Sequence, residues 1–366
     1  MFKNIYKKKK VLITGNTGFK GSWLTAWLIK LGANIVGISK DIPTNPSIFK
    51  ELKLEGQIKH YKEDIRDLSK MIDIISDEKP DFLFHLAAQP LVLTSYTNPI
   101  ETISSNVMGT ANILEAMKVL NNKCIAVIIT SDKAYDNVEQ VLGYKEDDKL
   151  GGKDIYSGSK GAAELIIKSY HHSFLKSENS NLKLAIGRAG NVIGGGDWAK
   201  DRIVVDCIKA WSKGKIAEVR TPKATRPWQH VLEPLSGYLN LGSELCVKDD
   251  LQGEAFNFGP DEEQNPTVEE LIIELSKYWG FEDKNSAYKI TNNIIFHEAK
   301  LLKLNCEKAF SHLKWKANLN YKDTVKFTGE WYYDFYKKNN NIFDKTLDQI
   351  TEYENSAKEK ALKWTE

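Results

Sequence analysis

Cysteine is scarce in this chain of 366 residues. The four cysteines lie far apart and form no Cys-x-x-Cys pair, which argues against a disulfide framework, a zinc ribbon and a redox dithiol. A reducing cytoplasm is therefore the expected location. The seven histidines show no metal-ligand spacing, because the adjacent His171 and His172 would point about 100° apart on a helix. We expect no metal site.

An excess of one charge is also lacking. Lys and Arg number 51 and Asp and Glu 49, so the net charge of +2 creates no field that would steer the chain onto nucleic acid or an anionic membrane. No apolar run approaches the ~18 residues of a transmembrane helix. The basic segment 1–10 is followed by only a short apolar run, 11–13, which is too short for the core of a signal peptide. Any anion is expected to be bound locally.

The composition is that of a globular protein, with 42% apolar and 27% charged residues, and the length suits about two domains. The first 130 residues alternate short apolar runs with amphipathic stretches. Strands are expected at 11–14, 33–38, 81–86 and 125–130, and helices at 22–31, 69–76 and 100–120. Because the strand runs do not alternate, they should be buried on both faces, as in a parallel sheet. The predicted fold is α/β, a doubly wound parallel sheet of the Rossmann type.

A smaller substrate domain is expected to be interleaved with this sheet toward the C-terminus. Segment 221–234 holds three prolines, a helix is predicted at 202–213 and a further buried strand at 254–258. Thr267 is the expected N-cap of a helix over 266–280. The predicted boundaries are a dinucleotide-binding domain of residues 1–190 plus about 231–260, and a substrate domain of about 191–230 and 261–366.

The segment Gly15-Asn-Thr-Gly18-Phe-Lys-Gly21 lies between the first predicted strand and the first helix. Glycine suits this place because the chain must turn sharply and a pyrophosphate must reach backbone N–H groups without a Cβ in the way. A glycine string can also be a plain turn, but its position after a buried strand favours a dinucleotide site. The expected contacts come from Gly15, Thr17, Gly18, Phe19, Lys20 and Gly21.

The end of the second strand leaves the choice of cofactor open. An acidic residue there would hold the ribose 2′-hydroxyl of NAD, but the chain has Ser39 and Lys40 at this place and Asp41 two positions late. A Ser–Lys pair could accept the 2′-phosphate of NADP, whereas Asp41 could still reach the ribose. Asp64, followed by Ile65, could accept from an adenine amine or, equally well, cap the next helix.

A tyrosine and a lysine four residues apart share one face of a helix. A lysine cation beside a phenol favours the phenolate, which can act as a base toward a sugar hydroxyl. This pattern occurs three times, at Tyr6/Lys10, Tyr156/Lys160 and Tyr333/Lys337. Tyr156 is favoured because it follows Ser131, which ends a buried strand at the sheet edge where doubly wound folds bind ligands. Ser131 could hydrogen-bond the oxygen that Tyr156 deprotonates.

These features, with the strings His85-Leu-Ala-Ala88 and Asn106-Val-Met-Gly-Thr110, resemble the extended short-chain dehydrogenase/reductase family. Narrower strings are similar to those of CDP-glucose 4,6-dehydratases, namely Thr17-Gly-Phe-Lys-Gly-Ser-Trp23, Ala88-Gln-Pro-Leu91, Thr130-Ser-Asp-Lys133, Gly194-Gly-Gly-Asp-Trp198 and Arg226-Pro-Trp-Gln-His-Val-Leu-Glu-Pro-Leu-Ser-Gly-Tyr238. The resemblance covers about residues 9–330. It implies CDP-glucose as a small-molecule substrate and NAD as the cofactor, whose contacts would include Leu86, Ala87, Ala88, Tyr156 and Lys160.

The resemblance also implies an internal redox cycle. Tyr156 would take the proton of the C4 hydroxyl while hydride passes from C4 to NAD⁺, water would be eliminated across C5 and C6, and the hydride would return to C6. Lys160 would hold the nicotinamide ribose. Asp132 would protonate the departing C6 hydroxyl and Lys133 would remove the C5 proton, which requires a raised pKa of Asp132 and a lowered pKa of Lys133. The alternative for Asp132 and Lys133 is a surface pair after a strand.

The substrate diphosphate needs local cations and donors, and the resemblance assigns Arg226 to a two-point contact with it. His230 could donate to the diphosphate or ribose, or be a packed structural residue. Trp198 and Trp228 could flank the cytosine or belong to the core. Leu93 stands where the resemblance leads one to expect an arginine, a departure from the family pattern. Further substrate-binding candidates are Gln89, Asn191, Arg202 and Arg220.

Three other functions compete with a CDP-glucose dehydratase. Nucleotide-sugar epimerases share the Ser/Tyr/Lys core but need no C5 base, and related dTDP-sugar dehydratases carry Asp–Glu where this chain has Asp132 and Lys133. dTDP- and UDP-sugar dehydratases are thus the nearer rivals, and a non-catalytic NAD(P)-binding sensor would keep only the fold. Related enzymes are dimers or tetramers, so we expect a homo-oligomer built through helices that include 100–120 and 162–173.

Overall fold

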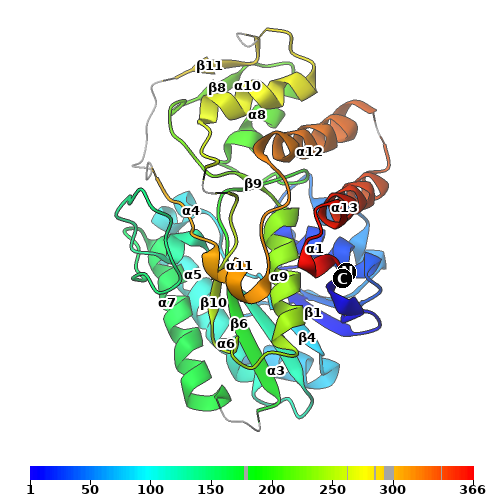
Figure 1. Ribbon diagram of the computed structural model, residues 1–366, viewed down its shortest axis with the longest axis vertical. Coiled ribbons are helices and arrows are strands. Elements are labelled where there is room, and N and C mark those ends of the chain that lie inside the picture. The colour runs from blue at the N-terminus through cyan, green and yellow to red at the C-terminus, as the bar shows by residue number, and fades with distance from the viewer. Residues whose placement is uncertain (177–179, 262, 284–285, 292–300, 339) are drawn as a thin grey trace.

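Seven parallel strands form the central sheet of the computed structural model, which describes all residues except 177–179, 262, 284–285, 292–300 and 339 (Figure 1). The strand order is β10-β6-β5-β4-β1-β2-β3. The strands are β1 (Lys10–Thr14), β2 (Asn34–Ile38), β3 (Lys59–Tyr61), β4 (Phe82–His85), β5 (Cys124–Ile129), β6 (Leu182–Arg188) and β10 (Ala255–Asn257). The predicted doubly wound parallel sheet is confirmed, and each strand predicted from an apolar run lies within one residue of its expected bounds.

Helices cover both faces of the sheet because alternate strand residues point to opposite sides. In β1, Val11 and Ile13 belong to the core that also contains α1 (Phe19–Lys30) and α9 (Leu232–Leu245), whereas Leu12 belongs to the core of the other face. That second core is completed by α3 (Leu68–Glu78), α6 (Gly109–Met117) and α7 (Ile155–Tyr170). Burial on both faces explains why the strand sequences are continuous apolar runs.

The helix predicted over 100–120 consists of three consecutive helical segments, α5 (Pro99–Ile103), a π-helical turn (Ser104–Met108) and α6. It ends earlier than predicted, at Met117. The π turn presents Asn106, whose side chain donates to the Gln89 carbonyl (3.1 Å) and to Ser159 Oγ (2.9 Å). Asn106 therefore fixes the loop after β4 to α7, a role that the sequence did not reveal. Two short helices, α2 (Ile48–Glu51) and α4 (Val92–Thr97), lie in neighbouring loops.

A smaller layer stands at one end of the sheet (Figure 1). It contains α8 (Ile203–Trp211), β8 (Ala217–Val219), α10 (Val268–Trp279), β11 (Tyr288–Ile290) and α12 (Tyr321–Tyr333). β8 pairs with β11, and the short strands β7 (Val192–Ile193) and β9 (Gln229–His230) pair where the chain crosses between the layers. Thr267 is the N-cap of α10 as predicted, and it forms a reciprocal capping box with Glu270.

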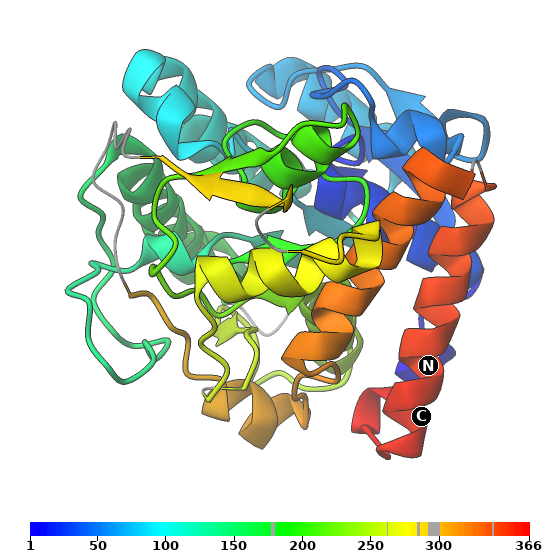
Figure 2. The same ribbon diagram turned by 90° about the horizontal axis from the view of Figure 1, so that it is seen from above.

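The last helices return to the sheet layer. α11 (Glu307–Leu313) contacts α9 and β10, and α13 (Ile342–Glu359) packs on α1. The two chain ends lie side by side (Figure 2), and the Lys3 N–H donates to the Glu366 carbonyl (2.9 Å). Part of the segment predicted for the substrate domain thus packs on the sheet layer, while the domain boundaries themselves stay a prediction.

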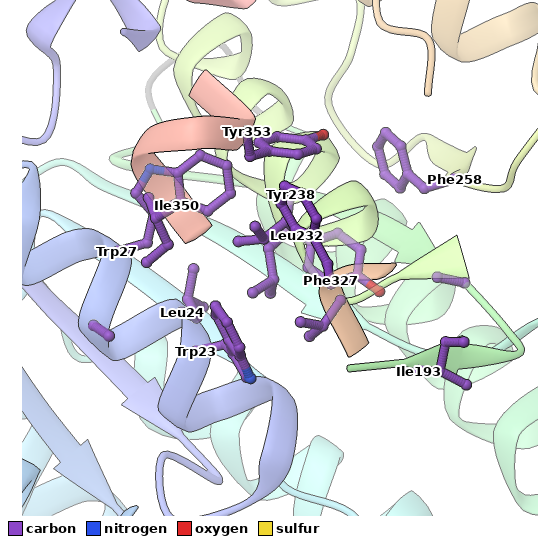
Figure 3. Close-up of a cluster of buried hydrophobic side chains, with 14 of the residues drawn as sticks. Trp23, Leu24, Trp27, Ile193, Leu232, Tyr238, Phe258, Phe327, Ile350 and Tyr353 are labelled. Atoms are coloured by element: carbon purple, nitrogen blue, oxygen red, sulfur yellow. The ribbon is translucent and has the colours of Figure 1, made fainter. Parts of the chain in front are cut away.

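Aromatic side chains join α1 to α9 and α13 (Figure 3). Trp27 Nε1 donates to Glu354 Oε1 (2.8 Å), and its ring meets Tyr353 edge to face at 5.7 Å. Trp23 Nε1 donates to the Gly195 carbonyl (2.9 Å) in the loop after β7. Both tryptophans are fully buried, and truncation of such a side chain to alanine costs about 3–5 kcal/mol. This core fixes α1, whose N-terminus carries the glycine loop.

Candidate active site

A cleft of about 1650 Å³ lies at the carboxyl ends of the strands, between the sheet and the layer of α8 and β8. Its lining comes from residues that directly follow β1, β2, β4 and β5, and from α8 and segment 218–226. His230 is absent from this lining. The cleft brings together the other predicted site residues, which are Gly15, Thr17, Gly18, Phe19, Lys20, Gly21, Ser39, Asp41, Asp64, Ile65, Leu86, Ala87, Ala88, Gln89, Ser131, Asp132, Lys133, Tyr156, Lys160, Asn191, Arg202, Arg220 and Arg226.

The glycine loop forms an open cradle at the N-terminus of α1. Gly15 has a φ of +77°, and a Cβ there would lie 2.7 Å from the backbone nitrogen of Ala87. A Cβ on Gly21 would lie 2.1 Å from the Gly15 carbonyl oxygen, so α1 can start this close to β1 only with glycine. The N-cap is Gly18, which has no side chain to cover the first N–H groups of the helix. The residues present therefore fit a pyrophosphate.

Residues after β2 brace this loop. Ser39 Oγ donates to Asn16 Oδ1 (2.8 Å) and accepts from the Thr17 N–H (3.3 Å). The Thr17 hydroxyl donates to the Asp41 carbonyl (2.7 Å). Ser39 is thus tied to the loop backbone, and the fully buried Asn16, which sequence reasoning passed over, is part of the same support.

Lys40 and Asp64, two charged residues of the predicted cofactor site, each form an ion pair with a neighbouring side chain. Lys40 Nζ lies 2.9 Å from a carboxylate oxygen of Glu101. Arg66 Nε lies 3.1 and 3.0 Å from the two oxygens of Asp64, and this contact lowers the pKa of the Asp64 carboxyl. Lys40, the cation available for a 2′-phosphate, is therefore already paired.

The structure distinguishes the three Tyr-x-x-x-Lys copies. Tyr156 and Lys160 line the cleft from α7, and each is 7% exposed. Tyr6 instead donates to the Leu239 carbonyl (2.6 Å) inside the core. Tyr333 lies on α12, where Lys338 Nζ stands 5.6 Å from the centre of its ring. The predicted choice of Tyr156 thus agrees with its place in the cleft.

Burial dominates the ionisation of this pair. It raises the pKa of Tyr156 to about 12, while a hydrogen bond with Ser131 and the charge of Arg202 act in the opposite direction. Burial also lowers the pKa of Lys160 to about 8, against the charge of Glu164 one turn further along α7. The sequence suggests that Lys160 lowers the pKa of the phenol, but in the protein without ligands the opposing effect of burial is larger.

Lys20 of the glycine loop reaches the same region. Burial and the charge of Arg202 lower its pKa to about 8, and Asp132 opposes this change. The charge of Lys160 also lowers the pKa of Lys20. Lys20 therefore lies close to the candidate catalytic residues, in addition to its place in the loop that fits a dinucleotide.

Asp132 and Lys133 follow β5 in a short 3-10 turn. Ser131 Oγ donates to Asp132 Oδ1 (2.8 Å) and accepts from the Lys133 N–H (3.2 Å). Gly190, in the loop after β6, packs against the Asp132 carboxyl: a Cβ there would lie 1.9 Å from Oδ2 and 2.0 Å from Cγ. Gly190 is a positioning residue that the sequence did not reveal, because its partner comes from a distant part of the chain. The one available signal was the glycine directly before Asn191.

Substitution of Gly190 by alanine should displace the Asp132 carboxyl and lower turnover about tenfold to a hundredfold, since a shift of ~1 Å can cost this much. The matched control is Gly158→Ala in α7, where a Cβ would meet nothing within 4 Å. The measurement is turnover of the nucleotide sugar together with the melting temperature. Equal turnover of the two variants would show that the reaction does not depend on the position of the Asp132 carboxyl.

Two predicted substrate contacts have other partners in the structure. Gln89 Nε2 donates to the Leu91 carbonyl (3.0 Å) and to Thr102 Oγ1 (2.8 Å), and Gln89 Oε1 accepts from the Leu91 N–H (2.6 Å). Its side chain thus shapes the loop after β4. Asn191 has a φ of +52°, and its carbonyl accepts from the Gln229 N–H (3.2 Å), which joins β7 to β9.

Three arginines lie on the wall of the cleft that faces the sheet. Arg202 precedes α8 and pairs with Asp197. Arg220 directly follows β8, and Arg226 Nη1 donates to the Thr225 carbonyl (2.9 Å). They stand among carboxylates of the same wall, which include Asp197, Asp201 and Asp206, so any anion would meet single cations and not a uniformly positive surface.

His230 is fully buried behind the cleft. Its ring lies edge to face with Trp23 (5.7 Å) and Phe327 (5.4 Å), and burial lowers its pKa to about 3, so it is neutral. This placement favours the packed alternative over a substrate contact. Trp198 also packs inside the aromatic core, against Trp331 and its neighbours, whereas Trp228 lines the cleft.

Within the described part of the chain, the His, Cys, Asp and Glu side chains form no group that could hold a metal ion. The same residues include no helix long and apolar enough to cross a membrane. All four cysteines are described and are free thiols.

Comparison with known proteins decides the family. The model of the GDP-mannose 4,6 dehydratase family matches residues 12–328. The chain belongs to this family. One relative is the CDP-glucose 4,6-dehydratase of Salmonella typhimurium, which is 43% identical over 333 residues. These residues are 90% of the chain and 92% of the relative. The resemblance to extended short-chain dehydrogenases/reductases and to dehydratases is thereby confirmed.

Solved structures share the fold. The dTDP-glucose 4,6-dehydratase of Streptomyces venezuelae, with NAD and TYD bound, gives a TM-score of 0.75 at 19% identity, covering 89% of this chain and 97% of that one. The UDP-glucose 4-epimerase of Thermotoga maritima gives 0.75 at 21% identity, with 89% and 99% covered. Members with dehydratase and epimerase names thus share one architecture, so the fold does not by itself choose between these reactions.

Proposed function

We propose that this chain is an NAD-dependent hydro-lyase that converts CDP-D-glucose to CDP-4-keto-6-deoxy-D-glucose and water. The observation that carries the proposal is one cleft holding Ser131, Tyr156 and Lys160 beside Asp132 and Lys133. The 43% identity to a CDP-glucose 4,6-dehydratase supports the nucleotide and the sugar.

NAD is the proposed cofactor. Its pyrophosphate would lie on the glycine loop, and Asp64 is an ionised acceptor at the proposed adenosine end of the same groove. The pairing of Lys40 with Glu101 supports NAD over NADP, because it leaves this cation less available to a 2′-phosphate. When bound there, NAD⁺ would supply a hydride acceptor for C4 of the sugar and the hydride for C6, with no net consumption of cofactor.

The proposed role of Tyr156 is to accept the proton of the C4 hydroxyl. Ser131 hydrogen-bonds the phenol in the structure and would share the same substrate oxygen. Lys160, buried one turn further along α7, supplies a cation whose effect on the phenol grows as water leaves the cleft. Its other proposed role is to hold the ribose next to the nicotinamide.

Elimination is assigned to Asp132 and Lys133. A ketone at C4 acidifies the C5 hydrogen, and Lys133 is the proposed base that removes it. Asp132 donates a proton to the C6 hydroxyl as the C6–O bond breaks, and water leaves. Gly190 leaves room for the Asp132 carboxyl close to Ser131, so the acid stands next to the group that binds the C4 oxygen.

Arg226 and Arg202 are the proposed cations for the substrate diphosphate, and Arg220 is a further proposed substrate contact. Asn191 would add a contact, whereas Gln89 and His230 would act through the packing of neighbouring segments. An epimerase needs no acid and base beyond the Ser/Tyr/Lys core, so the cleft-lining Asp132–Lys133 pair favours a dehydratase. The nearer rivals act on dTDP- or UDP-glucose.

The test is incubation of the purified protein with CDP-glucose and a catalytic amount of NAD⁺, followed by mass spectrometry and NMR. A 4-keto-6-deoxy sugar should form with many turnovers per cofactor, and faster than from dTDP- or UDP-glucose. Accumulating NADH or a need for stoichiometric oxidant would contradict the internal cycle. An epimerised sugar without loss of water would point to an epimerase.

We also propose a homo-oligomer, a dimer or tetramer, located in the cytoplasm. Large apolar side chains are exposed on α5, the π turn and α7, within the two helical segments expected to form the interface; they include Ile100, Ile103, Met108 and Leu165. Apolar patches of this kind mark interaction surfaces. Light scattering that finds a monomer would contradict the assembly.

A further inference from the structure

Asp206 is an acid in the cleft that the proposed reaction does not use. It lies in the first turn of α8, is half-buried and lines the cleft. Among the residues that the structure describes, no donor hydrogen-bonds or pairs with its carboxyl group. Burial, with the neighbouring charge of Asp201, raises its pKa to about 6. Lys209, one turn nearer the end of α8, already donates to the Trp198 carbonyl (2.9 Å).

The position of Asp206 in the cleft indicates which end of the substrate it would contact. Its N–H donates to the Arg202 carbonyl (2.9 Å), so it stands one helical turn beyond the arginine whose charge reaches Tyr156. The sugar must lie at Tyr156, and the diphosphate needs the arginines. A carboxylate repels a diphosphate, so Asp206 is suited to the nucleoside end, which offers donors.

We propose that the Asp206 carboxylate accepts a hydrogen bond from the exocyclic amine of cytosine and so selects cytidine over uridine and thymidine diphosphate sugars. The inference rests on the proposed function and names the residue that reads the base. Cytosine presents an amine donor at its 4-position, whereas uracil and thymine present a carbonyl acceptor there. A carboxylate opposite that carbonyl would leave two acceptors facing each other, which excludes the wrong base by repulsion.

Arg220 would add hydrogen-bond donors beside the Asp206 carboxylate. It follows β8 on the same wall, and it is close enough for its charge to act on Asp206. A carboxylate beside a guanidinium offers an acceptor next to donors, which matches the amine of cytosine and its neighbouring ring acceptors. Uracil has a carbonyl acceptor at the place of this amine, so its edge does not match the carboxylate.

Binding of CDP, UDP and dTDP to the full-length protein tests the proposal, with tryptophan fluorescence as the signal. In Asp206→Asn, CDP affinity should fall by about tenfold to a hundredfold, the value of a lost hydrogen bond to a charged group. UDP affinity should stay unchanged or rise, because the new amide can donate to the carbonyl of uracil. The ratio of CDP to UDP affinity is the deciding quantity, and far-UV circular dichroism confirms folding.

Asp201→Asn is the charge-matched control: it removes the same charge from the same wall of the cleft, and because it also removes a charge that raises the pKa of Asp206, it should keep or raise the wild-type ratio. Glu218, which pairs with Lys289 (2.9 Å), is the rival acid in the lining. An unchanged ratio in Asp206→Asn, an equal loss for all three nucleotides, or a collapse of the ratio only in Glu218→Gln would each overturn the proposal. A wild-type protein without preference for CDP would instead overturn the choice of nucleotide in the proposed function, and the inference with it.

Discussion

Tyr156→Phe should stop oxidation of the sugar at C4 and lower turnover by roughly 10²–10⁴-fold, the usual contribution of a positioned base. The phenolate form of Tyr156 is the group that accepts the C4 hydroxyl proton, and phenylalanine keeps the ring while removing the oxygen. Burial raises the pKa of Tyr156 to about 12, against the hydrogen bond with Ser131 and the charge of Arg202, so formation of the phenolate depends on these neighbours. Single-turnover appearance of NADH, with the product assay, measures this step.

Tyr333→Phe is the matched control for this experiment. Tyr333 belongs to a second Tyr-x-x-x-Lys copy, but it lies on α12, away from the cleft lining. The same loss of a hydroxyl there should leave both signals at the wild-type level. Substrate binding should survive in Tyr156→Phe, so a loss of CDP affinity in parallel with turnover would assign the tyrosine to binding and not to proton transfer.

The sheet could be predicted from the sequence because its strands are local patterns. A strand buried on both faces is a short continuous apolar run, so β1, β4 and β5 were each placed to within one residue. The long helical stretch after α4 was also expected, but its π turn was not. The π turn, Ser104–Met108, is too short to leave a periodic pattern of its own in the sequence. What sets it apart is the contact of Asn106 with Gln89 and Ser159.

Site residues that follow a strand directly could also be predicted, since the carboxyl ends of parallel strands meet at one edge. Gly15, Ser131 and their neighbours belong to this class. Asp206 does not, and Gly190, although it follows β6, has a significance that depends on the Asp132 carboxyl, which a distant segment places beside it. His230 shows the reverse case: its string matches the family, yet its ring packs between Trp23 and Phe327. Sequence identifies the string, but only packing shows which of its side chains face the ligand.

The effect of burial on ionisation was likewise beyond the sequence. A lysine one turn from a tyrosine suggests a lowered phenol pKa, but the desolvation of both groups raises the pKa of Tyr156 and lowers that of Lys160. The cation that acts on the phenol in the structure is Arg202, from a different layer of the protein. Proton transfer at Tyr156 is therefore expected to depend on Arg202 in the second layer as well as on the residues of α7.

Lys133→Met should separate the two halves of the proposed reaction. Oxidation at C4 needs Tyr156, Ser131 and Lys160, so slow formation of NADH on CDP-glucose should persist. Elimination needs a base at C5, so the 4-keto-6-deoxy product should fall by roughly 10²–10⁴-fold. In deuterated water, exchange at C5 should be lost together with the product, because both require removal of the same proton.

Lys153→Met is the charge-matched control, since Lys153 lines the same cleft from the loop before α7. It should keep both NADH formation and elimination. Asp132→Asn provides the complementary case: it should retain C5 exchange while losing water release, because the base remains and the acid is gone. If Lys133→Met and Asp132→Asn lose oxidation and elimination to the same extent, the pair supports the geometry of Ser131 through its short turn and carries no proton. The separation of exchange from water release is thus the measurement that assigns base and acid to their residues.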